Sequence, residues 1–370
     1  MNPMCRWIKS VKQAGVSSMK DVAIISFAQT DAVRNAGGTN EVELIMPVVQ
    51  QALADAGLKS VQDVGFVCSG SCDYQQGAAF AFVLGVDALG AVPPIKESHV
   101  EMDAAWALYE SWLKIQMGHA DSALIYGFGK SSPGELASVL SLQLDPYYLA
   151  PLWPDTVSLA ALQARAMLDA GVITEAEMAE VVSRSRANAK ANPHAQLSGD
   201  YSIEQLLAEP TFVSPLRKHD CCPISDGASA MVICTVEKAQ QLGKPYALIK
   251  GIDHRIETHQ PGLRDLTVSS STRLAGEKAG LKQAPVQVAE LYAPFSHQEV
   301  ILKQALGLDD SVVINPSGGV LAGHMLMASG LSRIGEVAMR IIKGDYQRGV
   351  AHATSGPCLQ QNLVTVLESA

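Results

Sequence analysis

Residues 315–330 read N-P-S-G-G-V-L-A-G-H-M-L-M-A-S-G, and four of these residues are glycine. A glycine inside a helix or strand costs about 0.5–1 kcal/mol relative to alanine, so the run predicts a loop that turns sharply or packs closely. A β-branched segment at 311–314 precedes the loop and predicts a strand. A helical pattern follows, with apolar residues at Leu331, Ile334, Val337 and Ile341. This order of strand, loop and helix places His324 beside backbone N–H donors. The histidine is then either a functional imidazole or a surface residue on a structural loop.

Composition limits the class of protein. The chain has 370 residues, of which 48% are hydrophobic and 18% charged, and this favours two units with cores of their own. A net charge of −9 argues against nucleic acid or an anionic membrane as the main partner. The seven cysteines lack zinc-ligand spacing, which predicts reduced thiols, no metal and a cytoplasmic location.

The ends and apolar runs of the chain give two further expectations. No apolar run approaches the roughly 20 residues that span a bilayer, so no membrane span is expected. Residues 1–18 lack the apolar segment of a signal peptide and are expected to form a peripheral tail.

Strands and helices alternate along the first 126 residues. Strands are predicted at 22–27, 64–68 and 123–126, and helices at 41–57, 75–84 and 103–117. This alternation predicts an α/β fold with parallel strand pairing.

The same order returns in the second part of the chain. The tetrapeptide A-G-L-K at 56–59 recurs at 279–282, and Gly118 has a counterpart in Gly344, each about 225 residues later. An internal duplication explains both, with strands 246–252, 288–292 and 350–353 and a helix at 331–343 in the second copy. Between residues 129 and 225 the alternation stops, which predicts an insert.

The glycine loop resembles the NxxGGxxxxGHPxGxxG signature of thiolases, with Met325 where the family has proline. The resemblance implies an α/β thiolase fold of two duplicated βαβαβαββ halves in a five-layer αβαβα arrangement with an inserted loop domain. We expect a tail at 1–18, a first half at 19–240 that includes the loop domain at about 129–225, and a second half at 241–370. In such proteins the insert covers the active site and holds CoA. Its aromatic and proline-rich run at 145–155 either lines an acyl pocket or packs the loop domain.

The resemblance also implies a set of site residues. His324 is expected to be the general base, and Tyr292 stands in E-L-Y-A-P-F where sterol-carrier-protein-type thiolases have histidine. The phenol would donate a hydrogen bond to an oxyanion or give a proton to the substrate. Alternatively, Tyr292 only caps the end of the sheet. Cys358 falls near the family's C-terminal cysteine and would be acid, base or nucleophile, unless it is a small buried apolar residue. Substrate-binding groups are expected at the loop and at the first-half helix: Gly318, Gly319, Gly323, Ser317 and Asp103.

One family feature is missing. A thiolase needs a thiolate at the start of the central helix of its first half, yet no cysteine lies between Cys72 and Cys221. Asp103 lies at that helix start instead, where N-capping is the simpler role. The C-C-P-I-S-D-G-A segment at 221–228 resembles one in thiolase-like lipid-transfer proteins and is expected to support the fold beneath the site.

These residues predict an atypical thiolase-like acyltransferase, similar to acetyl-CoA acetyltransferases, that makes or breaks a C–C bond beside an acyl-CoA thioester. The alternatives are a retro-aldolase of the steroid side-chain type with a small OB-fold partner, and a non-catalytic lipid or acyl-CoA binding protein. The resemblance implies CoA thioester as substrate, no permanently bound cofactor, a role in lipid metabolism or transfer, and a homodimer paired through an edge strand at 95–99.

Overall fold

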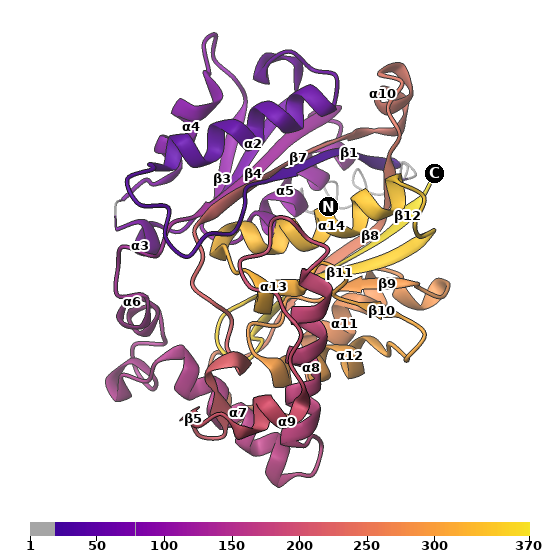
Figure 1. Ribbon diagram of the computed structural model, residues 1–370. Coiled ribbons are helices and arrows are strands. Elements are labelled where there is room, and N and C mark those ends of the chain that lie inside the picture. The colour runs from indigo at the N-terminus through magenta and orange to yellow at the C-terminus, as the bar shows by residue number, and fades with distance from the viewer. Residues whose placement is uncertain (1–18, 78) are drawn as a thin grey trace, which may run out of the picture.

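Ten strands form one continuous hydrogen-bonded array in the computed structural model, which describes residues 19–77 and 79–370 (Figure 1). The expected tail at 1–18 lies outside the described residues. The strand order is β10-β9-β11-β12-β8-β1-β7-β4-β2-β3. The strands are β1 (Val22–Gln29), β2 (Phe66–Gly70), β3 (Glu97–Val100), β4 (Ser122–Gly129), β7 (Gly227–Thr235), β8 (Ala247–Ile256), β9 (Val288–Glu290), β10 (Val313–Ile314), β11 (Arg348–Ser355) and β12 (Gln361–Ser369).

The array consists of two five-stranded sheets with the same topology. In the first, β2 pairs in parallel with β3 and β4, while β7 is antiparallel to β4 and β1. In the second, β9 pairs in parallel with β10 and β11, while β12 is antiparallel to β11 and β8. A short antiparallel pairing of β1 with β8, from Val22 opposite Ile249 to Ile24 opposite Ala247, joins the sheets. The topology therefore repeats, as the sequence repeat predicts.

Two helices lie between the sheets, as the sequence predicts. These are α5 (Ala104–Gln116) and α14 (Ser329–Ile342), which share one apolar core with strands of both sheets (Figure 1). On α14 the core residues Leu331, Ile334, Val337 and Ile341 are buried, because they recur on one helical face.

The outer faces of the two sheets are also covered. Helix α2 (Glu41–Asp55) packs on the far face of the first sheet. Helices α11 (Ser270–Lys278) and α12 (Ser296–Leu306) cover the far face of the second. The result is the expected five-layer αβαβα arrangement, in which two further helices, α10 (Val236–Gln241) and α13 (Gly319–Ala322), follow β7 and β10.

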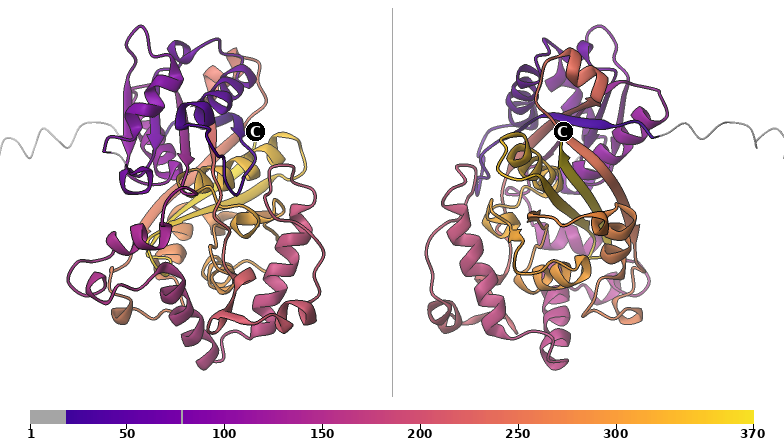
Figure 2. Two further views of the ribbon diagram at one scale, coloured as in Figure 1. Left: turned by 60° about the vertical axis from the view of Figure 1, so that its left-hand side comes forward. Right: turned by 90° about the vertical axis from the view of Figure 1, so that its right-hand side faces the viewer.

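The insert forms its own layer below the two sheets, as both views of Figure 2 show. Across residues 130–226, all of which the structure describes, the chain adds no strand to the large array. It folds into four helices and a small hairpin of β5 (Thr211–Val213) and β6 (Leu216–Arg217). The helices are α6 (Leu136–Leu142), α7 (Thr156–Asp169), α8 (Glu175–Ala189) and α9 (Ile203–Ala208).

The sequence prediction was wrong at the helix expected at 75–84. Two short helices stand there instead, α3 (Asp73–Gln76) and α4 (Phe82–Leu89). Gly77 ends α3 with a left-handed backbone, at φ 69°, and a helix cannot continue through that conformation. The strands expected at 64–68 and 288–292 are β2, which begins at Phe66, and β9, which ends at Glu290.

The divisions expected at residues 129, 225 and 240 remain predictions. In the part of the chain that the structure describes, no helix has both the length and the apolar character to cross a bilayer.

Candidate active site

Tyr292 and His324 meet at the centre of the molecule. Tyr292 lies two residues beyond the end of β9, and His324 lies in the loop between α13 and α14. The phenol oxygen is 2.7 Å from His324 Nε2, and the two rings meet edge to face with their centroids 5.4 Å apart. The main-chain N–H of His324 donates to Ser225 Oγ at 2.9 Å, which holds the loop in place. The structure therefore brings together two of the three residues expected to be catalytic.

Cys222 is a third group at this site that sequence reasoning missed. Its sulfur lies 3.5 Å from His324 Nδ1, on the side of the ring away from Tyr292. Cys222 N–H donates to Pro294 O at 2.8 Å, so this segment is tied to the chain just after Tyr292. The C-C-P-I-S-D-G-A segment was expected only to support the fold. In the structure this segment supplies both Cys222 and Ser225 to the same histidine, a contact that no local sequence pattern indicates.

Burial keeps all three groups uncharged. Burial and the nearby Arg333 lower the pKa of His324 to about 4. Burial raises the pKa of the Cys222 thiol to about 12. It also raises the pKa of the Tyr292 phenol well above its usual value, with Asp103 and Cys222 adding to the shift. At neutral pH the resting site therefore holds a neutral imidazole between a phenol and a thiol.

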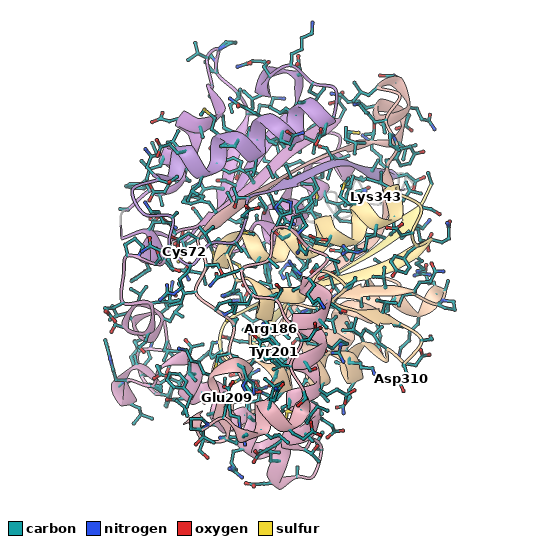
Figure 3. The ribbon with its side chains drawn as sticks, viewed as in Figure 1. Cys72, Arg186, Tyr201, Glu209, Asp310 and Lys343 are labelled. Atoms are coloured by element: carbon teal, nitrogen blue, oxygen red, sulfur yellow. The ribbon has the colours of Figure 1, made fainter. Side chains whose placement is uncertain are left out.

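The insert holds the glycine loop from one side. Three polar side chains of α8 and its C-terminal turn donate to main-chain oxygens of the loop: Ser185 to Gly318 at 2.6 Å, Asn188 to Asn315 at 2.9 Å and Asn192 to Ser317 at 3.0 Å. Arg186, labelled in Figure 3 near Tyr201, donates to the carbonyl of Leu321. A loop rich in glycine has little stiffness of its own, so these contacts fix its path.

An ion pair supports the loop from below. Glu290 is fully buried, and its carboxylate accepts from Arg333 Nη1 at 2.6 Å. The same carboxylate accepts from the N–H and the hydroxyl of Ser317 at 2.9 and 2.8 Å. Ser317 was expected to bind substrate, but its side chain is buried in this network and is not free to do so.

The first half accepts the His324 loop because it has glycines on the facing strands. A Cβ atom at Gly127 would lie 2.6 Å from Met327 O and 2.6 Å from Ala104 Cβ. At Gly129 and Gly227 it would collide with Met325. The G-F-G pattern of β4 therefore serves close packing between the halves. Met325, which replaces the proline of the thiolase signature, is buried in that contact.

Asp103 caps two helices at once. Its carboxylate accepts from Ala105 N–H in α5 at 2.8 Å, and from Gly330 and Leu331 N–H in α14 at 2.8 and 3.2 Å. The side chain is buried, which raises its pKa to about 7, while the three amide donors and Arg333 oppose that shift. Asp103 was expected among the substrate-binding groups, but its acceptors are used within the protein, because the N-termini of α5 and α14 meet at this point.

The glycines expected to bind substrate have internal roles as well. Gly318 N–H donates to Asn315 O at 2.9 Å, and Gly319 N–H donates to Ser317 Oγ at 3.1 Å, so neither is free for a substrate oxygen. Both have left-handed backbones, at φ 93° and 64°. Gly323 leaves room for Ala32, whose Cβ would lie 2.8 Å from an added Cβ.

Cys358 is not in hydrogen-bond contact with His324. It is buried in the turn between β11 and β12, and its thiol donates to the carbonyl of Leu159 in α7 at 3.5 Å. Burial raises its pKa to about 11. The thiol in contact with the His324 imidazole is that of Cys222 and not that of Cys358.

Across residues 19–77 and 79–370, no group of three or more His, Cys, Asp or Glu side chains is arranged to hold a metal ion.

Known proteins with similar sequences are thiolases and sterol carrier proteins, although no protein-family model matches the chain. An acetyl-CoA acetyltransferase of Methanocaldococcus jannaschii is 28% identical over 361 residues, covering 86% of this chain and 89% of that protein. Sterol carrier protein 2 of Gallus gallus is 28% identical over 335 residues, covering 79% of this chain. The chain matches only 60% of the length of that protein.

Solved structures with the same fold include a thiolase and an aldolase. Human mitochondrial 3-ketoacyl-CoA thiolase superposes with a TM-score of 0.77 at 17% identity, over 96% of this chain and 100% of that one. A chain of an Ltp2-ChsH2(DUF35) aldolase superposes with a TM-score of 0.78 at 21% identity, over 94% of this chain and 98% of that one. The fold of this chain is therefore the thiolase fold.

The chain differs from the thiolase pattern at the start of α5. The resemblance implies a nucleophilic cysteine at that position, and the N-cap of α5 is Asp103. The charge of that carboxylate contributes to the raised pKa of the Tyr292 phenol. The hydrogen-bonded pair of Tyr292 and His324 thus lies near a helix start that lacks a thiol.

Proposed function

We propose that this protein is a thiolase-superfamily enzyme that makes or breaks a C–C bond beside an acyl-CoA thioester, using Tyr292 and His324 as an acid–base pair. The observation that carries the proposal is the 2.7 Å contact between the Tyr292 phenol and His324 Nε2. A neutral imidazole can accept the phenol proton while the phenol oxygen accepts one from the substrate. CoA thioester is the proposed substrate, with no permanently bound cofactor.

A retro-aldol reaction suits this pair better than thiolysis. Thiolysis by the usual thiolase route needs an acyl-enzyme on a cysteine at the start of α5, and Asp103 stands there. In a retro-aldol step the Tyr292 oxygen takes the proton of a β-hydroxyl group and the Cα–Cβ bond breaks. A carbonyl compound then leaves, and the thioester enolate regains a proton at Cα. The similar fold of the Ltp2-ChsH2(DUF35) aldolase supports this candidate.

The test is a comparison of two substrates with one matched pair of variants. Wild-type protein is incubated with acetoacetyl-CoA plus CoA, and separately with a β-hydroxyacyl-CoA. His324→Ala is run beside His119→Ala, which changes an exposed histidine after α5. We expect turnover that His324→Ala lowers by about 10²–10⁴-fold and His119→Ala leaves unchanged. Product from the β-hydroxyacyl-CoA alone would favour the retro-aldolase.

The non-catalytic alternative predicts a different result. A lipid or acyl-CoA binding protein would bind both thioesters in calorimetry. It would turn over neither, with or without a small OB-fold partner protein. That outcome would contradict the proposed enzyme.

Partners enter the proposal in two ways. A small OB-fold protein would complete the site; the aldolase of similar fold is named for two proteins, Ltp2 and ChsH2(DUF35). A second copy of this chain would pair through β3, which stands at the end of the strand order. Light scattering at micromolar concentration tests the pairing, since an obligate interface commonly exceeds about 2,000 Å² and would leave no monomer.

A further inference from the structure

We propose that Cys222 is a positioning residue, whose sulfur holds the proton of His324 on Nδ1 so that Nε2 presents a lone pair to Tyr292. This inference rests on the proposed function for its catalytic meaning, but its geometry stands independently. The imidazole has one partner on each nitrogen, the phenol on Nε2 and the sulfur on Nδ1.

The two distances favour this tautomer. The Tyr292 O–H has two possible acceptors, His324 Nε2 at 2.7 Å and the main-chain carbonyl of Leu326 at 3.4 Å. Only the shorter contact has the length of a good hydrogen bond donated by a hydroxyl group, so we take the phenol to donate to an unprotonated Nε2. The ring proton then lies on Nδ1, where the Cys222 sulfur at 3.5 Å accepts it.

Burial opposes transfer of the Cys222 proton to His324 in the resting site. Moving its proton to His324 would have to overcome the difference between a thiol pKa of about 12 and an imidazole pKa of about 4. The thiol therefore stays protonated and acts as a neutral hydrogen-bond partner.

The orientation has a direct consequence for the reaction. When the Tyr292 oxygen accepts a substrate proton, its own proton moves to Nε2, and the imidazolium that forms keeps its Nδ1–H on the sulfur. In the opposite tautomer Nε2 already carries a proton and cannot accept one. The part played by Cys222 thus corresponds to that of the third member of a catalytic triad, which fixes the tautomer of the histidine.

The experiment reads the tautomer directly by NMR of protein with ¹⁵N-labelled histidine. We expect a one-bond N–H coupling on Nδ1 of His324 in wild-type protein and in Cys222→Ser, whose hydroxyl is also an acceptor. Cys222→Ala and Cys222→Val both remove the acceptor. The valine variant fills the space left by the thiol and serves as the second test if the alanine variant does not fold. In these variants we expect Nε2–H to appear. Cys221→Ala, at the neighbouring thiol that contacts Arg217 O, is the matched control and keeps the wild-type spectrum.

Kinetics give a second reading on the same variants. We expect Cys222→Ala to lower kcat by about 10–100-fold with KM unchanged, and Cys222→Ser to recover part of the loss. Nε2–H in wild-type protein, or Nδ1–H that survives in both Cys222→Ala and Cys222→Val, would overturn the inference. A protein inactive on every thioester, but with a tautomer that depends on Cys222, would contradict the proposed function and support this inference.

Discussion

The carboxylate of Asp103, at the N-terminus of α5, accepts a hydrogen bond from the N–H of Gly330, at the N-terminus of α14, at 2.8 Å. The two residues come from the two halves of the chain, so one side chain caps the central helices of both. A thiolase nucleophile is expected at this helix start. In this chain the position instead holds an acidic group that joins the halves, and the proposed chemistry therefore relies on Tyr292 and His324.

Asp103→Ala is expected to cost more stability than an ordinary cap. It leaves three buried N–H groups without their acceptor, and we expect the free energy of unfolding to fall by about 3 kcal/mol or more. Asp155→Ala is the matched control. Asp155 caps only α7, through Ser158 N–H, so its loss should cost about 1 kcal/mol. Urea denaturation measures both, and equal losses would contradict the double cap.

His324 should make the protein less stable in acid. Its pKa of about 4 lies below the 6.5 of an unfolded histidine, so the unfolded chain binds more protons between these values. Stability is therefore lost as the pH falls from 6.5 to 4, by at most about 1.4 kcal/mol per pH unit from this group.

Asp103 acts in the opposite sense over the whole of that range, because its pKa is raised from 3.8 to about 7 and the folded state binds the extra proton. The test is therefore a difference between variants. His324→Gln should flatten the acid side of the stability curve relative to wild type, and His119→Gln should not. Parallel curves for His324→Gln and wild type would show that the imidazole is charged in the folded protein.

Gly127→Ala should disturb the site from the opposite half. The added methyl would lie 2.6 Å from Met327 O, so the segment that carries His324 has to move. We expect a loss of about 1–3 kcal/mol in unfolding free energy together with lower turnover. Gly134→Ala, where no atom lies within 4 Å of the added methyl, is the control. Wild-type stability in Gly127→Ala would contradict the close packing of the two halves.

Thiol alkylation should separate Cys222 from Cys358. Cys222 is partly exposed, whereas Cys358 is 6% exposed and donates to Leu159 O. We expect iodoacetamide to inactivate slowly by alkylating Cys222, and Cys358→Ala to retain nearly full activity. Peptide mass mapping identifies the alkylated thiol. Inactivation that follows Cys358, and disappears in Cys358→Ala, would restore the role that the sequence suggested for it.

The fold could be predicted largely from local patterns. Alternating apolar strands and amphipathic helices are visible in one sequence, and the repeated A-G-L-K segment marks the duplication. The pattern failed at 75–84, where Gly77 adopts a left-handed backbone that composition alone does not reveal. Strand ends also shifted, by two residues at β2 and β9 and by up to four at the end of β8, because pairing partners set them.

The site was less predictable, because it is assembled from distant segments. His324 stood out from its glycine loop, and Tyr292 from its place after a strand. Cys222 did not stand out, because its contact with His324 joins residues 102 positions apart and no local pattern encodes it. Asp103 and Ser317 look like ligand-binding groups in sequence. Only the packing shows that Gly330, Leu331 and Glu290 already satisfy them.

The central claim is that Tyr292 and His324 act as one unit, and a double-mutant cycle on turnover tests it most directly. With the thioester that wild-type protein turns over, kcat is measured for Tyr292→Phe, His324→Ala and the double variant. We predict that His324→Ala lowers kcat by about 10²–10⁴-fold, that Tyr292→Phe lowers it less, and that the double variant is no worse than His324→Ala. Losses that multiply in the double variant would mean that the two residues act separately, and wild-type activity in His324→Ala would contradict the account.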